Sequence, residues 1–297
     1  MILNNQGVLS LRNRTLSHQQ LLYREARGSL SGKEREKLAR EEAGYIGEVL
    51  FDSKVAGIVQ NQNLIHIKNF LFEYDEDMEC QIDNLVIASN LVYIFEIKNL
   101  NVDLVIDNNE TWKFENGQVM SKSPMGQALA QKFILQQLFN EIRVPLSVEP
   151  FVVFMNPAQM IYGLYPGNNV LLSFQLDKKL PYILKPNNYD FLEFSGVIES
   201  RRKLVSKYYK AFEFDLENMK KGIVCDKCFK FIEKISSHNL FCGTCNKKMS
   251  MKDAIGMLFT ELSTYNPKFK ITSNEISELS GGIITSPTVR KYKNVLR

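Results

Sequence analysis

Residues 81–99 restrict the possible folds of this chain more than any other stretch. Two apolar runs rich in β-branched residues flank Ser89-Asn90, a dipeptide that suits a short turn, so the pattern predicts a β-hairpin. With a two-residue loop, Ala88 lies opposite Leu91, and the pairing of the other residues follows from that one pair. The stretch is therefore expected to form two antiparallel strands.

The same register brings four polar side chains together. Asp83 is expected directly across from Glu96, and Gln81 directly across from Lys98. Because successive side chains of a strand point to opposite faces, all four project from one face. The opposite face is the predicted core, formed by Ile82, Val86, Ala88, Leu91, Tyr93, Phe95 and Ile97.

Two carboxylates in this position need a cation between them. Directly opposed residues have Cβ atoms roughly 5 Å apart, and like charges at that separation destabilise a sheet. Lys98 is one candidate for this cation, and a bound divalent metal is a better one, since carboxylate oxygens are ligands that Mg²⁺ and Mn²⁺ favour. An Asp followed on the next strand by Glu-x-Lys is typical of metal-dependent nucleases. The alternative is a solvated polar face whose charges tolerate one another.

A helix expected over residues 32–51 supplies a third carboxylate. The segment is rich in helix formers, and Gly44 and Gly47 near its end imply close approach of another backbone. Glu48 lies in this small, apolar part, where a carboxylate needs a partner that the predicted metal site would supply. The alternative for Glu48 is an ordinary exposed glutamate on a helix.

A second helix is expected from Ser123-Pro124 to about residue 140, with the proline in its first turn. Gln127 and Gln131 lie one turn apart on the same face of this helix. They are candidates to contact a phosphate or a metal-bound water, and the alternative is that both are plain surface residues.

The remaining pattern predicts an α/β sandwich. A further helix is expected at 16–28, and residues 197–220 are expected to form a basic linking helix. Strands are expected at 63–72, 102–106, 111–114, 150–155 and 169–174.

Taken together, these motifs resemble the nuclease-related domain (NERD) of the PD-(D/E)xK nuclease superfamily. The resemblance covers roughly residues 38–160 and implies a restriction-endonuclease-like fold, in which helices flank a central mixed sheet. It rests on Gly44-Tyr45-Ile46-Gly47-Glu48, Gln81-Ile82-Asp83, Phe95-Glu96-Ile97-Lys98-Asn99, and Ser123-Pro124 with Gln127.

The resemblance also implies a role for each residue of the site. Asp83 and Glu96 would hold Mg²⁺ or Mn²⁺, with Glu48 as a further acid. Lys98 would orient or activate the attacking water, and Gln127 would support the site. Superfamily members include binding modules that have lost cleavage, so the resemblance leaves activity open.

Four cysteines form a separate motif in the C-terminal third. Cys225 and Cys228 make one CxxC pair, Cys242 and Cys245 make another, and thirteen residues separate the pairs. This spacing predicts one structural Zn²⁺ in a closed, tetrahedral Cys₄ zinc ribbon. Two disulfides are the weaker alternative in a chain expected to be cytoplasmic.

The last part of the chain is basic. Residues 221–297 hold 13 Lys and Arg against 6 Asp and Glu, which indicates a nucleic-acid contact at this end. The pattern at 271–282 and 286–297 resembles a helix-turn-helix, the alternative being a docking or dimerisation tail. In the former case four residues would contact phosphates and bases: Thr288, Arg290, Lys291 and Lys293.

These inferences divide the chain into five segments and indicate one function. We expect a metal-dependent nuclease that hydrolyses phosphodiester bonds in DNA, with RNA kept as an alternative substrate, recruited by its C-terminal modules. The alternative is an inactive nucleic-acid-binding protein or a protein-interaction adaptor that retains the fold. The segments are a helical extension at 1–37, the nuclease-like domain at 38–195, a linker helix at 196–221, the zinc ribbon at 222–249 and the helix-turn-helix-like module at 250–297.

The sequence also bears on location and assembly. No apolar run approaches the roughly 20 residues that cross a bilayer, so no membrane partner is expected. The N-terminus lacks the basic and apolar regions of a signal peptide, which predicts a cytoplasmic protein. A homo-oligomer or a protein partner would bind through the C-terminal region.

Overall fold

The computed structural model describes residues 12–62, 64–76, 78–88, 91–165, 167–185, 192–234 and 239–293. The chain forms two compact units. The first comprises Met1–Asn13 and Glu42–Ser206, and the second comprises Arg14–Glu41 and Lys207–Arg297. The chain thus leaves the first unit after Asn13 and returns to it within a helix.

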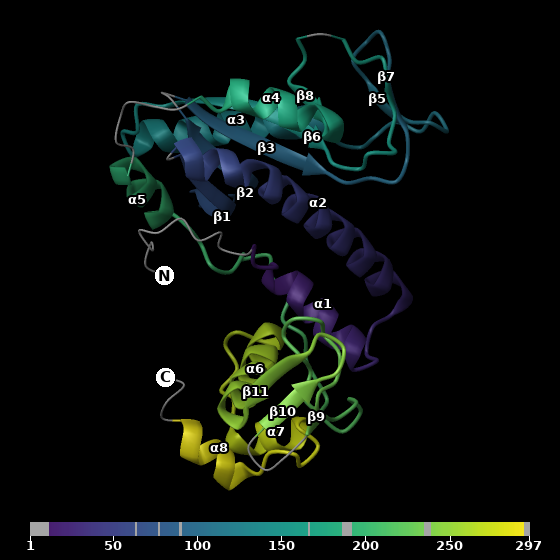
Figure 1. Ribbon diagram of the computed structural model, residues 1–297, viewed down its shortest axis with the longest axis vertical. Helices are drawn as coiled ribbons and strands as arrows, with labels where there is room; N and C mark the ends of the chain where they lie inside the picture. Colours follow the sequence, from purple (N-terminus) through teal and green to yellow (C-terminus); the bar gives the residue numbers. More distant parts are fainter. Residues whose placement is uncertain are drawn as a thin grey trace. The chain divides into compact units, whose positions relative to one another are not determined.

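A five-stranded mixed sheet forms the centre of the first unit, in the order β1-β2-β3-β6-β8 (Figure 1). The first three strands are antiparallel neighbours, whereas β3, β6 and β8 run parallel. This confirms the predicted central mixed sheet. The strands are β1 (Ile65–Asp75), β2 (Met78–Ala88), β3 (Leu91–Lys98), β6 (Ser147–Phe154) and β8 (Val170–Leu172).

Helices cover both faces of this sheet, so both faces are core. On one face, side chains of α3 and α5 pack against Leu85, Ile87 and Ile94. On the other face, side chains of α2 and α4 pack against Val86, Phe95 and Ile97. The helices are α2 (Gly32–Gln62), α3 (Pro124–Glu141), α4 (Leu176–Ile183) and α5 (Leu192–Ser200), with a 3-10 turn at Ser173–Gln175.

A second, three-stranded sheet extends the first unit. Its order is β5-β4-β7, with β4 at Leu104–Ile106, β5 at Trp112–Phe114 and β7 at Ile161–Tyr162. Trp112 stacks on Phe154 at 5.8 Å between ring centroids and closes a small core there.

The second unit has one continuous core. Residues of α1 (Leu16–Ala26) pack with the three-stranded sheet that bears Cys242 and with the three C-terminal helices in a single apolar cluster. A buried ion pair joins Arg27 to Glu261, with Nε 2.5 Å and Nη2 2.8 Å from the carboxylate oxygens. The other elements are β9 (Glu233–Lys234), β10 (Asn239–Cys242), β11 (Lys247–Ser250), α6 (Met251–Tyr265), α7 (Ser273–Leu279) and α8 (Ser286–Lys293).

The compact units therefore divide the chain differently from the five expected segments. Residues 14–41 belong with the zinc ribbon and the helical module, because α1 contributes to their common core. The expected N-terminal extension is thus split between the two units.

The linker helix expected at 196–221 is wrong over most of its length. The helix there is α5, which ends at Ser200, and residues 201–221 are irregular. Phe212, Phe214 and Leu216 recur at every second position and pack against the core of the second unit. That period fits an extended chain rather than a helix, and the Phe212 N–H donates to the Tyr265 carbonyl at 2.7 Å.

Across the described ranges, no helix has both the length and the apolar character that a bilayer-spanning segment requires.

Candidate active site

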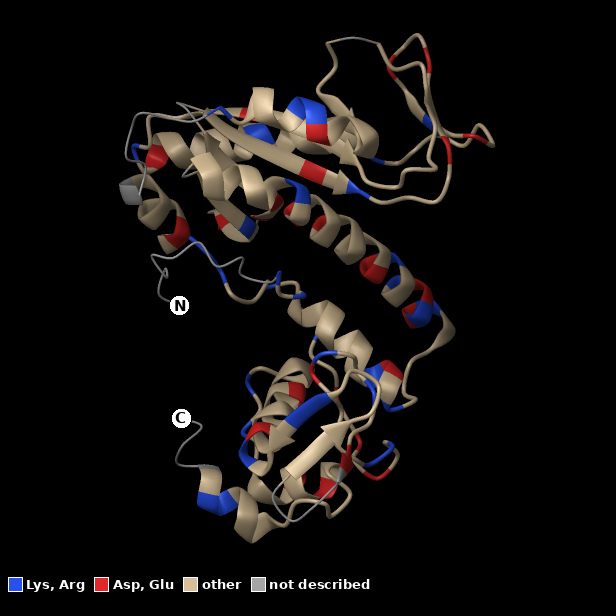
Figure 2. Cartoon of the chain, in the orientation of Figure 1, with Lys and Arg blue, Asp and Glu red and all other residues tan. Residues whose placement is uncertain are grey.

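The predicted hairpin register is correct from its turn down to the site. Ala88 pairs with Leu91, and the ladder continues in the same register to Asn84 and Phe95. The turn residues Ser89 and Asn90 lie outside the described residues. Figure 2 shows an acidic band followed by a basic tip at the end of β3. In sequence, the only charged residues of this strand are Glu96 and Lys98.

The ladder ends one pair before Asp83 and Glu96. At this level Asn69 on β1 has a left-handed backbone, with φ of 48°, and falls between the pairs Lys68–Asn84 and Phe70–Ile82. The alternation of side chains inverts at this point, so Ile82 packs in the same core as Leu85. The prediction that Ile82 shares a face with Val86 is therefore wrong.

Glu96 and Lys98 form a close ion pair supported by α3. Lys98 Nζ lies 2.6 Å from Glu96 Oε1 and donates to Gln127 Oε1 at 3.0 Å. Glu96 is 3% exposed, and its other oxygen accepts a hydrogen bond from Gln131 Nε2 at 2.8 Å. Gln131 also donates to the carbonyl of Gln81, whose own side chain is exposed. One face of α3 thus holds both residues of the Glu-x-Lys motif.

Asp83 lies beside this pair. Its Oδ2 accepts a hydrogen bond from the Ile97 N–H at 3.4 Å, where the ladder between β2 and β3 has ended. Burial raises the pKa of the Asp83 carboxyl well above its ordinary value of 3.8, and the carboxylates of Glu96 and Glu48 raise it further. Such a group favours either a proton or a nearby cation.

Glu48 joins the site from α2. Gly47 lets the helix approach β3 closely, since a Cβ at this position would lie 2.6 Å from Asn99 Cβ, whereas Gly44 has open space. The close approach predicted from the two glycines therefore holds for Gly47 alone. The pKa of Glu48 is raised by burial and by the nearby carboxylates of Asp52 and Glu96, against the lowering effect of Arg12.

The sequence-based reasoning missed Arg12, which is fully buried beside Glu48. Arg12 Nη1 donates to Glu48 Oε2 at 2.9 Å, and its other nitrogens reach Asp52 on the next turn of α2. Arg12 precedes the first predicted helix in a segment without apolar periodicity, so no local signal marks it.

A buried polar network adjoins Arg12 and was also missed. Asp52 lies 3.0 Å from Lys68 Nζ and 3.9 Å from His66 Nε2. Asn84 Oδ1 accepts hydrogen bonds from Arg12 and His66, at 2.6 and 2.8 Å. Burial lowers the pKa of His66 to about 4, so this histidine is neutral at pH 7. Its contacts with Asn84 and Asp52 fit a structural role.

The donor set of the site suits a hard divalent cation. Within the described residues, one oxygen each of Glu48 and Asp83 has no hydrogen-bond donor, whereas the other oxygen of each is held by the protein. Carboxylate oxygens of this kind are ligands for Mg²⁺ and Mn²⁺. The buried Gln131 Oε1 also lacks a partner there.

The three carboxylates are not drawn into one tight cluster. Of the described residues, the four cysteines alone form a group of three or more potential ligands within 4.8 Å of one another. Mg²⁺ usually binds proteins through one or two carboxylates and keeps several waters. Asp83 and Glu48 each offer one oxygen without a donor among the described residues, whereas both oxygens of Glu96 accept hydrogen bonds, from Lys98 and Gln131.

The raised pKa of Asp83 predicts how stability varies with pH. The folded protein keeps a proton on Asp83 that the unfolded chain has released, so the free energy of unfolding decreases from about pH 4 upward until the folded-state pKa is passed. Compared with Asp83→Asn, wild-type protein without added Mg²⁺ should lose thermal stability as the pH rises. His66 is common to both proteins, so its opposite contribution cancels in the difference. Parallel curves of melting temperature against pH would contradict the prediction.

The four predicted cysteines lie together in the second unit. Cys225 Sγ is 3.6 Å from Cys245 Sγ, and Cys228 Sγ is 3.4 Å from Cys242 Sγ. All are free thiols, and tetrahedral Zn–S bonds of about 2.3 Å would place the sulfurs roughly 3.8 Å apart. The cluster fits a small zinc ribbon and could hold a structural metal such as Zn²⁺.

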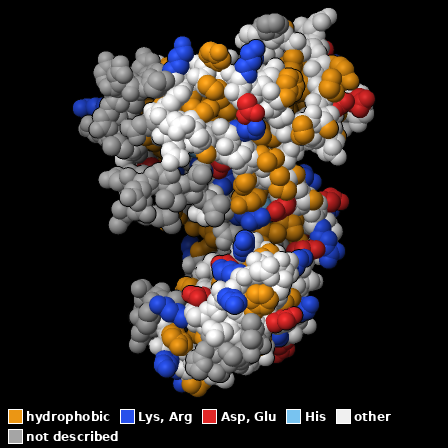
Figure 3. Space-filling view, in the orientation of Figure 1, with side chains coloured by type: hydrophobic (Ala, Val, Ile, Leu, Met, Phe, Trp, Pro, Cys, Tyr) orange, Lys and Arg blue, Asp and Glu red, His pale blue; other side chains and the backbone are white. Residues whose placement is uncertain are grey.

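The two expected C-terminal helices form as α7 and α8. The turn between them contains Gly281 and Gly282, both with left-handed φ, of 67° and 76°. On α8, Arg290 and Lys291 are exposed and Thr288 is half-buried, its hydroxyl 3.0 Å from that of Thr285. The side chain of Lys293 lies outside the described residues. On the face of the molecule seen in Figure 3, basic side chains of the second unit lie in several separate places.

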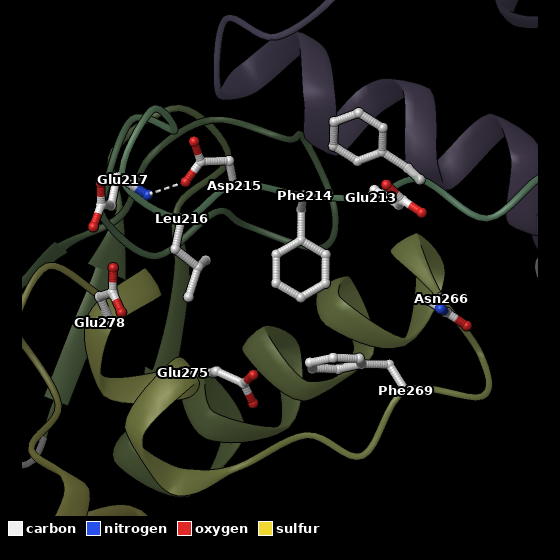
Figure 4. A pocket seen from close by; sticks show the side chains of 10 residues that line it. Glu213, Phe214, Asp215, Leu216, Glu217, Asn266, Phe269, Glu275 and Glu278 are labelled. Carbon is white, nitrogen blue, oxygen red and sulfur yellow. Dashed lines mark hydrogen bonds between the residues drawn. The ribbon is translucent and has the colours of Figure 1, made fainter.

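The second unit also contains an acidic cavity of about 440 Å³ (Figure 4). Phe214 and Phe269 line its base, with ring centroids 5.3 Å apart. Five carboxylates surround these rings: Glu213, Asp215, Glu217, Glu275 and Glu278. Such a rim repels phosphate, so this cavity is unsuited to nucleic acid.

A second cavity, of about 590 Å³, lies in the first unit, between the small sheet and the loop after β6. Asn101, three residues after Lys98, lines it together with Asn116, Gln118, Asn156 and Gln159. Neither cavity includes Asp83, Glu96 or Lys98.

Comparison with known families matches residues 43–155 to the nuclease-related domain. This range contains Glu48, Asp83, Glu96, Lys98 and Gln127, and it confirms the resemblance seen in the sequence. The same comparisons found no matching curated protein and no matching solved structure.

Proposed function

We propose that this chain, which carries a nuclease-related domain at residues 43–155, is a metal-dependent nuclease that hydrolyses phosphodiester bonds in DNA. The observation that carries the proposal is the grouping of Lys98, Glu96 and Gln127 beside Asp83, at hydrogen-bond distances, inside that domain. A purely structural site would not need a buried carboxyl such as that of Asp83, whose pKa is raised by burial and by the carboxylates of Glu96 and Glu48.

Each residue of the proposed site has its own role in hydrolysis. Lys98 supplies a positive charge where charge develops on the phosphate, and Glu96 and Gln127 fix its position. Asp83 and Glu96 would hold Mg²⁺ or Mn²⁺, with Glu48 as a further acid. The ion, when bound, would neutralise phosphate charge and make a water molecule more acidic. Gln131 keeps Glu96 in place.

The proposal is tested by a cleavage assay on defined single-stranded and duplex DNA, with Mg²⁺ or Mn²⁺ omitted and restored. Cleavage that requires the metal and depends on Lys98 supports the nuclease. Cleavage that needs no metal, or that survives loss of Lys98, would point to a contaminant and contradict the proposal.

We further propose that the second unit, held together by one structural Zn²⁺, recruits the nuclease to DNA through α8. Removing the whole region from residue 251 onward is a poor test, because Leu258 and Leu262 of α6 are fully buried in the core of this unit. Charge changes on the exposed surface of α8 are the sharper experiment.

Replacing Arg290 and Lys291 with glutamine should weaken DNA binding and flatten its salt dependence. Each phosphate contact contributes about −0.9 to the slope of log K against log salt concentration, so losing two contacts reduces the slope by roughly 2. The paired control replaces the exposed Lys33 and Lys230 of the same unit and should leave the slope closer to that of the wild type. Fluorescence anisotropy with a labelled duplex measures both.

A protein-interaction role of the second unit is the alternative, and the acidic cavity favours it. Its phenylalanines and carboxylates suit a basic side chain of a protein partner, and Glu213 lies on an extended segment at its rim. An unchanged salt slope in the α8 variant would favour this adaptor role over recruitment to DNA.

A further inference from the structure

We propose that Arg12 is a positioning residue that holds Glu48 and the Asp83 backbone in register for metal binding. The inference rests on the proposed nuclease function and adds to it a residue from outside the matched domain. Arg12 precedes that domain by thirty-one residues, and the chain passes through the second unit between Asn13 and Glu42.

One guanidinium connects α2 with two strands of the sheet. Its Nη1 donates to Glu48 Oε2 at 2.9 Å and to Asn69 Oδ1 on β1 at 2.6 Å. Its Nη2 donates to the carbonyl of Asp83 on β2 at 3.0 Å. Because both nitrogens are bonded to the same carbon in a rigid plane, they fix Glu48 relative to the residue that carries the principal carboxylate.

The remaining contacts hold Arg12 itself in place. The two carboxylate oxygens of Asp52 accept hydrogen bonds from Arg12 Nε and Nη2, at 3.1 and 3.0 Å. This bidentate contact fixes the plane of the guanidinium. The segment is also tied down through its backbone, because Tyr45 Oη donates to the Arg12 carbonyl and Asn69 Nδ2 donates to the Asn13 carbonyl. With its side chain fully buried, Arg12 cannot exchange these partners for water.

The hydrogen bond from Arg12 leaves one carboxylate oxygen of Glu48 available to a metal ion. Only Oε2 of Glu48 accepts from Arg12, and within the described residues Oε1 has no donor. A group that hydrogen-bonds to a metal-binding carboxylate without contacting the metal orients that carboxylate. Loss of such a group typically reduces metal affinity or activity 10- to 100-fold. The same guanidinium also contacts Asp52, which lies one helical turn from Glu48.

The test measures Mn²⁺ affinity by calorimetry on the full chain, already loaded with zinc so that the cysteines do not compete. Arg12→Lys keeps the charge but lacks the planar fork, and it should bind Mn²⁺ about 10-fold more weakly, or worse. In the double variant Arg12→Lys with Glu48→Gln, the two losses of affinity should be less than additive, because Arg12 acts in part through Glu48.

Lys68→Met is the matched control for a merely structural effect. Lys68 contacts Asp52 at 3.0 Å, so its loss perturbs the same buried network through Asp52. This variant should melt at a lower temperature than the wild type and yet bind Mn²⁺ with unchanged affinity.

The outcomes separate this inference from the proposed function. If wild-type protein binds Mn²⁺ and Arg12→Lys binds it equally well, the positioning role of Arg12 is wrong and the metal site stands. Additive losses in the double variant, or equal weakening in Lys68→Met, also overturn it. If wild-type protein binds no Mn²⁺ that depends on Asp83 and Glu96, the metal site and this inference fail together.

Discussion

Replacing Lys98 with methionine is expected to slow metal-dependent DNA cleavage by about 100- to 1,000-fold, the usual cost of removing one preorganised stabilising group. Methionine keeps most of the apolar stem and removes only the charged end. Lys98 is the cation that contacts Glu96 directly, at 2.6 Å, and Gln127 holds it from α3 at 3.0 Å. The rate of cleavage of a labelled oligonucleotide at saturating Mg²⁺ measures the effect.

Two controls separate chemistry from folding. Glu96 is buried, so without Lys98 its charge keeps Gln131 as its one side-chain donor among the described residues, and some stability will be lost. The double variant Lys98→Met with Glu96→Gln removes that unpaired charge, and it should regain thermal stability but not activity. Lys122→Met changes an exposed lysine in the loop before α3 and should cleave at the wild-type rate. Cleavage by Lys98→Met within a few fold of the wild type would refute the assignment.

Replacing Cys225 with serine is expected to abolish zinc binding and unfold the second unit. Structural zinc sites contribute about 10–16 kcal/mol of apparent binding free energy at pH 7. This is as large as the whole stability of a typical domain, about 5–15 kcal/mol. Cys225 and Cys242 are fully buried in the core that α1 and α6 share, so loss of the metal affects that entire core. Elemental analysis should give one zinc per wild-type chain and none in the variant.

The first unit should survive this change, since its cores contain no residue of the second unit. Calorimetry of the variant should therefore lose one of two thermal transitions. Cys80→Ala is the matched control, because Cys80 is a buried free thiol of the first unit and contacts none of the other cysteines. This variant should retain its zinc. A wild-type protein that is fully folded without metal would contradict the zinc ribbon.

Both predictions depend on short-range patterns. The register of the hairpin follows from a two-residue turn and a side-chain period of two, and these decide which residues of β2 and β3 can meet. The spacing of the cysteines likewise leaves few arrangements that bring four sulfurs together. The helical period placed Gln127 and Gln131 on one face, although the sequence could not show that this face meets Glu96 and Lys98.

Other features depend on contacts between distant segments, which no local pattern encodes. The left-handed backbone at Asn69 inverts the side-chain alternation beside Asp83, against the simple strand period. The extended run at 212–216, by contrast, has a local signal, because its apolar residues recur at every second position.

By itself, the sequence determined the central mixed sheet, the hairpin that carries Asp83, Glu96 and Lys98, and the cysteine cluster, because turn length, strand period and ligand spacing act over a few residues. The tertiary structure alone decided which distant groups complete each site. Arg12 reaches Glu48 across thirty-six positions, and α1 joins the zinc ribbon across some two hundred, through burial and hydrogen bonding that arise only when the chain has folded.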